Sequence, residues 1–430
     1  MHERTQRSLC RLAFIGLCLI PTLFSLGWIA YGRTDHHQTL SAEVWREQLA
    51  DWSGLHCEIG GIRYPRPGET VLEGVVLADS ETRQTIAELR LLVIERQGNV
   101  WMATASQPTI HADHVASLID LLHERMLKRL PSNFTPIEIN VAELTIADEP
   151  AARTLADVRA VIESGGNESR VSIDFRVARV EMSDRALFRA TRHRAARPST
   201  TWEFHTGAAG LPTNAAAGHF PWLESFGDRC EFRGTVLAKQ ADNGWQGRMS
   251  GQFSQLDLDR LVSQRFPHKL SGRADVLISD ARFEASRLTL FDATIVSEGG
   301  VVSQSLLQTA IGELQLRRAE TFLDGQQRHV AYEQLAVRAV LQPTGLALQG
   351  ICDHQPTRTL LAGRDGPILF DAEARELPTA ALVRLLATSN DHQVPATRET
   401  AALFDILPLP PIERADGPTP AAYVPVRLRP

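Results

Sequence analysis

The sequence predicts a mainly β protein with a few short helices. The expected protein consists of a long antiparallel sheet, preceded by a membrane-spanning helix and followed by a disordered tail. Three observations indicate this fold. Residues 12–31 carry no charged side chain. Apolar and polar residues alternate in many segments between residues 70 and 352, as strands with one buried and one solvated face require. Proline is dense after residue 388.

The uncharged segment 12–31 is as long as the roughly 20 residues that cross a bilayer core. Three arginines precede it: Arg4, Arg7 and Arg11. Only Arg33 follows closely, and this asymmetry keeps the N-terminus cytoplasmic and exports the rest. A cleaved signal peptide is the alternative, because Ala30-Tyr31-Gly32 is a small-x-small site. We expect a retained anchor, so that residues 1–33 form the cytoplasmic N-terminus and a single transmembrane helix.

Residues 34–387 are expected to form the exported β-rich domain. Alternation is strict in 171–177, where one face carries Val171, Ile173, Phe175 and Val177, and it recurs in 335–341. Further strands are predicted at 70–79, 85–95, 99–106, 155–163, 230–239, 245–255, 272–279, 282–296 and 345–352. This pattern is typical of antiparallel sheets.

Helices interrupt the strands at a few places. Residues 40–53 form one apolar stripe at helical spacing, and a further helix is predicted at 301–311. Segments 107–122, 251–264 and 371–386 share one form, a short extended stretch followed by a helix with paired aliphatic residues. The recurrence favours a long sheet whose open end or edge is covered by helices. Chance similarity among short helices is the alternative.

Two segments lack such patterns. Residues 181–228 are predicted to be an irregular insertion or long loop. Residues 388–430 are predicted to be a disordered, proline-rich tail, because proline blocks helix interiors and central strands. One aliphatic cluster in the tail is expected to dock locally or to bind a partner: Leu403, Phe404, Ile406 and Leu407.

Chemical motifs are missing from the sequence. It contains no GxSxG, SxxK, HExxH, Walker A or GxGxxG pattern, so we expect no catalytic residue and no enzyme activity. The formal net charge of −6 does not indicate a general nucleic-acid-binding surface. His111 and His114 share a helix face, but nothing selects further ligands, so we expect no metal and no cofactor. Among Cys57, Cys230 and Cys352, spacing does not show whether any two pair.

Two groups of residues are candidates for binding. The first is an arginine run that includes Arg185, Arg189, Arg192 and Arg194. Guanidinium groups bind phosphate, so one interpretation is that this run contacts anionic headgroups or an acidic partner. The favoured alternative is a solvated loop or a charge-protected strand edge. The second group is the apolar face of 171–177, which either belongs to a closed sandwich core or lines a groove for acyl chains.

Several segments resemble the AsmA-like family of envelope proteins. After the apolar helix, Trp52-Ser53-Gly54 ends an amphipathic helix, and strands follow at 57–62 and 71–79. The next strand carries Ala87-Glu88-Leu89. The stretch 270–276 and the helix near Leu306-Leu307 are similar to the C-terminal module of the family.

The resemblance implies a single-pass inner-membrane protein with most of the chain in the periplasm. It also implies a long, curved, groove-like sheet that holds lipid and takes part in phospholipid movement and outer-membrane assembly. Membrane lipids and envelope proteins are then the expected partners. This chain is shorter than the long members of the family.

The first functional hypothesis is therefore a non-catalytic hydrophobic groove for lipid handling or outer-membrane assembly. An anchored β-domain that scaffolds envelope partners is the alternative, and an unrecognised exported enzyme is the third. A trough lined only by apolar side chains favours the first, a closed core the second, and a polar cleft with histidines and carboxylates the third.

Overall fold

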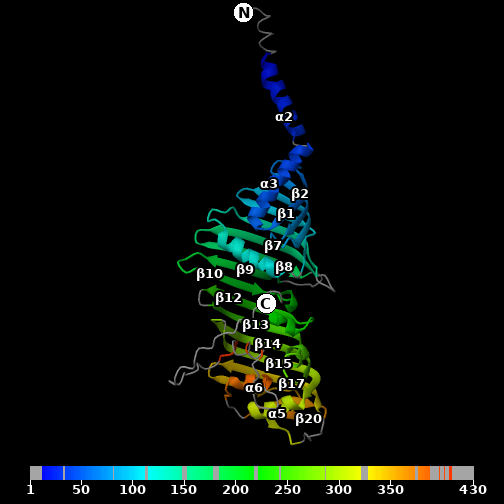
Figure 1. Ribbon diagram of the computed structural model, residues 1–430, viewed down its shortest axis with the longest axis vertical. Helices are drawn as coiled ribbons and strands as arrows, with labels where there is room; N and C mark the ends of the chain where they lie inside the picture. Colours follow the sequence, from blue (N-terminus) through cyan, green and yellow to red (C-terminus); the bar gives the residue numbers. More distant parts are fainter. Residues whose placement is uncertain are drawn as a thin grey trace, which may run out of the picture.

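The computed structural model describes residues 12–31, 34–80, 82–111, 115–147, 153–177, 184–216, 221–241, 244–285, 287–320, 328–372, 376–387, 397, 401 and 406–408. Strands dominate these residues, and helices are few, which confirms the predicted mainly β fold. The strands follow one another along the long axis of the molecule (Figure 1).

The strands belong to one sheet. Their bounds are β1 (His56–Arg63), β2 (Glu69–Ala78), β3 (Thr85–Gln97), β4 (Val100–Ser106), β5 (Thr109–His111), β6 (Ile137–Ala147), β7 (Arg153–Gly165), β8 (Glu168–Val177), β9 (Ala186–His193), β10 (Ser199–His205), β11 (Leu211–Pro212), β12 (Glu231–Ala241), β13 (Gly244–Asp257), β14 (Leu270–Glu284), β15 (Arg287–Ser303), β16 (Arg317–Arg318), β17 (His329–Gln342), β18 (Gly345–Gly350), β19 (Thr359–Gly363) and β20 (Gly366–Phe370).

Most described helices are short, and the longest has 19 residues. They are η1 (Ile15–Leu19), α2 (Ile20–Tyr31), α3 (Asp35–Ser53), α4 (Val115–Leu121), η3 (Leu122–Leu127), η4 (Thr213–Ala216), η5 (Pro221–Phe226), η6 (Asp259–Ser263), α5 (Gln304–Glu313) and α6 (Ala380–Ala387). Within the described residues, no helix is both long and apolar enough to cross a membrane.

Strand pairing mostly follows chain order, from β1 at one end to β17 and its neighbours β18 and β19 at the other. The pairs are antiparallel except β4–β6 and β5–β6, which are parallel. The sheet is therefore mixed and not purely antiparallel as the sequence predicted. The reason lies in α4 and η3, which carry the chain back between β5 and β6, as a parallel pairing requires.

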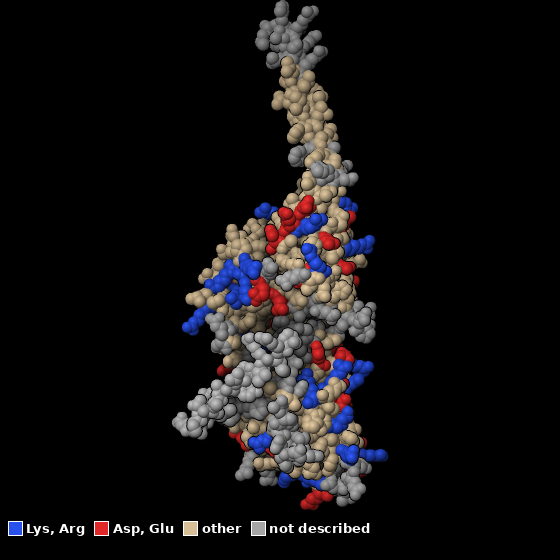
Figure 2. All heavy atoms as spheres, in the orientation of Figure 1, with Lys and Arg blue, Asp and Glu red and all other residues tan. Residues whose placement is uncertain are grey.

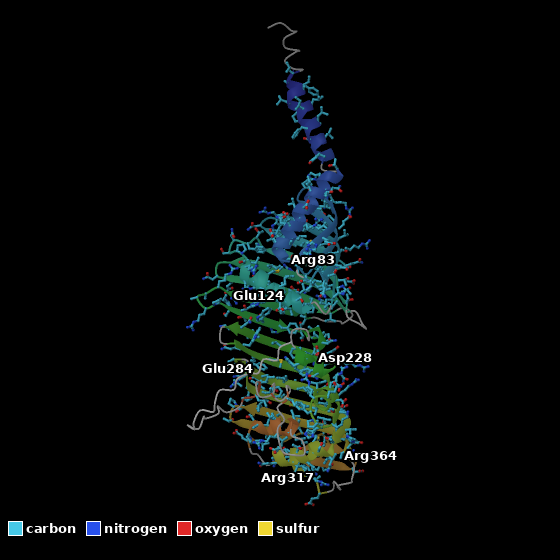
Figure 3. The ribbon with its side chains drawn as sticks, viewed as in Figure 1. Arg83, Glu124, Asp228, Glu284, Arg317 and Arg364 are labelled. Atoms are coloured by element: carbon cyan, nitrogen blue, oxygen red, sulfur yellow. The ribbon has the colours of Figure 1, made fainter. Side chains whose placement is uncertain are left out.

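The two ends of the strands differ. Short turns follow β7, β9, β14 and β17 at one end, which we call the hairpin side. Longer connections with η4, η5, η6 and α5 lie at the other end, which we call the helix side. Glu284 on the hairpin side and Asp228 on the helix side mark these opposite ends in Figure 3.

The sheet has one polar and one apolar face. Ion pairs link neighbouring strands on the polar face, including Arg159–Glu138 at 2.9 Å and Arg338–Asp292 at 2.9 Å. Such exposed pairs each contribute about 0–1 kcal/mol. Stability therefore comes mainly from the apolar face, where the buried side chains gather.

Helices pack against the apolar face in separate places. Trp45 and Leu49 of α3 pack on the cluster formed by β1 to β7. Leu127 of η3 is completely buried with Val171 of β8 and Ala190 of β9. α5 and α6 join the cluster of β12 to β20. The sequence predicted that helices cover the open end or an edge of the sheet, whereas these helices pack on its apolar face.

One predicted boundary needs correction. The segment 181–228, expected to be an irregular insertion, contains β9 and β10, which pair with each other and with β8 and β12. The arginine run obscured the alternation, because Arg192 takes a place on the apolar face and Ala186 and Ala190 are small. Only the part after β10 is mostly irregular, with η4 and η5.

The predicted tail also needs correction at one point. Leu407 is 7% exposed and belongs to the core cluster of β12 to β20. The buried Thr379 hydroxyl donates a hydrogen bond of 3.1 Å to the Pro408 carbonyl. Leu407 thus docks locally, whereas Ile406 of the same predicted cluster is 45% exposed. Leu403 and Phe404, like most other residues of the predicted tail, lie outside the described residues.

Truncation after residue 387 is expected to destabilise the C-terminal part of the sheet by about 2–4 kcal/mol. This truncation removes Leu407 from the core cluster, which exposes the apolar side chains beneath it, and it leaves the Thr379 hydroxyl without its acceptor. Truncation after residue 408 is the control and is expected to change stability little. Thermal melting of both variants distinguishes these outcomes, and equal melting temperatures would show that Leu407 contributes nothing.

Candidate functional site

The apolar face continues through the strand register from β3 to β18. Directly paired residues of successive strands lie on the same face. From β3 to β18, one row of such partners is Ile94, Ala103, Ile139, Ala160, Ile173, Phe188, Phe204, Val236, Met249, Ala281, Phe291, Leu341 and Leu346. No charged or hydrogen-bonding side chain interrupts this row.

Coverage of the apolar face is uneven along the sheet. Under η3, Val171 is 1% exposed, and at the far end Leu341 and Leu346 are 3% and 1% exposed. Between them lies a section of half-buried side chains, which we call the open section: Trp202, Phe204, Val236, Met249 and Phe291. These residues come from β10, β12, β13 and β15.

The four residues predicted for a groove lie on the apolar face, but they differ in burial. Val171 is completely enclosed beneath Leu127. Ile173 and Phe175 are half-buried and pack against the neighbouring clusters, and Val177 pairs with Leu155. The predicted residues therefore line one face, and η3 already covers Val171.

Two of the four predicted arginines point to the polar face. Arg185 forms an ion pair with Asp174. Arg189 contacts Glu203 at 2.9 Å and Ser172 at 3.4 Å. Both guanidinium charges are thus neutralised by carboxylates on neighbouring strands.

The other two arginines lie near the hairpin side of the apolar face. Arg192 pairs in register with Thr200 and donates a hydrogen bond of 3.0 Å to its hydroxyl. Arg194 contacts the Leu130 carbonyl and the hydroxyls of Ser164 and Ser169. Neither forms an ion pair with a carboxylate of the residues that the structure describes.

A buried histidine links η3 to this corner. His123 Nε2 lies 3.1 Å from the completely buried Thr200 hydroxyl, and its ring packs on Trp202 at 5.5 Å. Burial lowers the pKa of His123, and the nearby Lys128 adds to this effect. The imidazole is therefore neutral at pH 7 and holds η3 against β10.

Other reactive groups do not form a chemical site. Burial raises the pKa of Cys57 and of Cys230 to about 11, so both thiols stay protonated at neutral pH. Cys57, Cys230 and Cys352 are unpaired. Across the described ranges, no group of three or more metal-binding side chains gathers, and Asp113 and His114 lie outside those ranges. A small hollow beside Leu307 and Ile368 holds about one water molecule.

The sequence interpretation missed the aromatic residues of the open section. Trp202 and Phe204 alternate in 199–205, and Phe188 stands opposite Phe204. This alternation was the available signal, but it lay inside the segment assigned to an insertion. Thr200 and His123 carried no signal, because only the register brings them together.

No protein-family model, curated protein or solved structure matches this chain. The similarity to AsmA-like proteins therefore rests on the glycine and aliphatic motifs of the sequence alone.

Proposed function

We propose that this is a membrane-anchored envelope protein whose apolar sheet face holds lipid acyl chains in a groove, without catalysis. The observation that carries the proposal is the uninterrupted apolar row from β3 to β18, together with its half-buried open section. Large contiguous apolar surfaces that remain partly exposed usually bind something, and the open section is half-buried by the described residues.

The open section has the dimensions of an acyl-chain site. Strands lie about 4.8 Å apart, so the five successively paired strands β10, β12, β13, β14 and β15 span about 20 Å. Each methylene that leaves water against these side chains contributes about 0.8 kcal/mol. Binding is then passive, and transfer needs no reacting group.

The anchor is the second part of the proposal. η1 and α2 project beyond the β1 end of the sheet (Figure 1). Their large apolar side chains are exposed, with Leu17 at 77% and Phe24 at 70%. This surface, with the arginines before it, supports insertion into the inner membrane with the sheet in the periplasm. Membrane lipids and envelope proteins are the proposed partners.

The test compares two neighbouring residues of β12 that point to opposite faces. Val236 is half-buried in the open section, and Leu237 is 47% exposed on the polar face. The purified full chain is expected to retain lipid, measured by mass spectrometry of its organic extract. Val236→Glu is expected to reduce the retained lipid about tenfold or more, because a carboxylate resists burial against acyl chains.

Leu237→Glu is the matched control and should retain lipid as the unaltered chain does. Repeated absence of lipid from well-folded protein would refute the proposal and favour the scaffolding alternative. Equal loss in both variants would place the bound lipid somewhere other than the open section.

A further inference from the structure

Arg192 and Arg194 have no partner anion among the residues that the structure describes. Both side chains are half-buried, and no carboxylate of the described residues forms an ion pair with either. Glu124, the acidic group on the adjacent helix, is engaged by Lys128 and lies 3.1 Å from His123. This corner therefore has an excess of positive charge among the described residues. A partly desolvated charge is costly unless it is paired, so an anion bound here would be favoured.

Hydrogen-bond donors are also in excess there. Nε of Arg194 and Nε1 of Trp202 are buried and have no acceptor in the structure. Native proteins leave few such groups unsatisfied, and each one calls for an explanation. Both orphan groups are donors, and an anion supplies the acceptors that they lack.

The position of this corner connects it to the open section. Thr200, Trp202 and Phe204 alternate along β10, so one face of this strand leads from the Arg192 contact into the open section. Figure 2 shows Lys and Arg side chains gathered at this level of the molecule, beside the helix that carries Glu124 in Figure 3.

We propose that Arg192 and Arg194 bind the anionic headgroup of an amphiphile, such as a phosphate monoester, whose acyl chain lies on the open section. This inference rests on the proposed function and adds the charge class of the ligand and the place of its headgroup. Guanidinium groups form paired, charge-assisted hydrogen bonds to phosphate oxygens. Arg185 and Arg189 do not take part, because Asp174 and Glu203 neutralise them.

The experiment measures binding of two lipids with the same acyl chains to the full chain. Dioleoyl phosphatidate carries a phosphate, and dioleoylglycerol carries none. The unaltered protein is expected to bind phosphatidate at least about tenfold more tightly. Arg192→Gln should bring the ratio close to one without changing dioleoylglycerol binding, and Arg192→Lys should keep part of the preference.

Arg189→Gln is the matched control, since this arginine lies on the same strand and the opposite face, and it should keep the full preference. Arg194→Gln is a second variant, and melting temperatures confirm that each variant is folded. Equal binding of both lipids by the unaltered protein, or a preference that survives both substitutions, would overturn the headgroup site and leave the acyl site standing. Failure to bind either lipid would overturn the proposed function itself. Inorganic phosphate that binds as tightly as phosphatidate and displaces it would assign the corner to a small anion instead.

Discussion

Gly300→Ala is expected to destabilise the section formed by β14, β15 and β17 by about 3 kcal/mol or more. A Cβ atom at Gly300 would lie 1.9 Å from the Ser271 carbonyl oxygen and 2.6 Å from the Tyr332 hydroxyl. The first of these atoms belongs to the backbone of the paired strand, so it cannot move away without breaking the register.

Position 300 requires glycine because an aromatic ring packs directly over it. Gly272, Gly300 and Tyr332 are direct partners in adjacent strands, and the tyrosine side chain covers the two glycines. Tyr332 is 3% exposed, and its hydroxyl donates a hydrogen bond of 2.7 Å to the Ser271 carbonyl. Burial raises the pKa of Tyr332, so the phenol remains a donor. An aromatic side chain that packs over glycine restores the contacts that glycine lacks.

The matched control is Gly312→Ala in α5. Nothing lies within 4 Å of a Cβ atom at Gly312, and alanine is favoured in helices by up to about 1 kcal/mol. Hydrogen exchange of segments 270–303 and 329–342 is expected to accelerate strongly in Gly300→Ala and to stay unchanged or slow down in Gly312→Ala. Unchanged exchange in Gly300→Ala would mean that the close approach of Ser271 is not maintained in solution.

Alternation predicted most of the strands, because burial of one face imposes a period of two on the sequence. Segments such as 85–95 and 245–255 match β3 and β13 closely. β6 and β19 were missed, and β9 and β10 were assigned to an insertion. In β9, alanines and Arg192 occupy apolar-face positions, and neither residue type indicates burial by itself.

Strand pairing determines which of the four arginines are neutralised, and the sequence alone did not show this. Because side chains alternate along a strand, the sequence places Arg189 and Arg192 on opposite faces of β9. It shows neither which of these faces is apolar nor which strand pairs with β9. Only the register places Arg189 beside Glu203 and Arg192 beside Thr200. The four arginines, treated as one run in the sequence, therefore divide into a neutralised pair and a pair that has no carboxylate partner among the described residues.

Crossovers were equally hard to predict. The helix over 107–122 was expected, but its consequence, the parallel pairing of β6 with β4 and β5, was not. A crossover depends on where the chain re-enters the sheet, which is a tertiary property. The covering of Val171 by η3 follows from the same crossover, whereas Ile173 and Phe175 stay half-buried like the residues of the open section.

Asp371→Ala is expected to destabilise the C-terminal end of the sheet by about 3 kcal/mol. Asp371 is 2% exposed, and its carboxylate accepts hydrogen bonds from the Gly350 amide at 2.9 Å and from Arg358 Nε at 2.6 Å. Removing it leaves a buried amide unpaired and a guanidinium without its counter-charge, and breaking a buried pair costs about 3–5 kcal/mol. The Arg358 side chain is 36% exposed, so solvent reduces the effect to the lower end of that range.

Asp292→Ala is the matched control for the loss of an ion pair. Asp292 also accepts two hydrogen bonds from one arginine, at 3.1 and 2.9 Å from Arg338, whose side chain is 51% exposed on the polar face. This substitution is expected to cost less than about 1 kcal/mol. Hydrogen exchange of segment 345–370 should accelerate in Asp371→Ala and not in Asp292→Ala. Equal effects would mean that Asp371 acts as a surface ion pair and that β18 and β20 are held together by apolar packing alone.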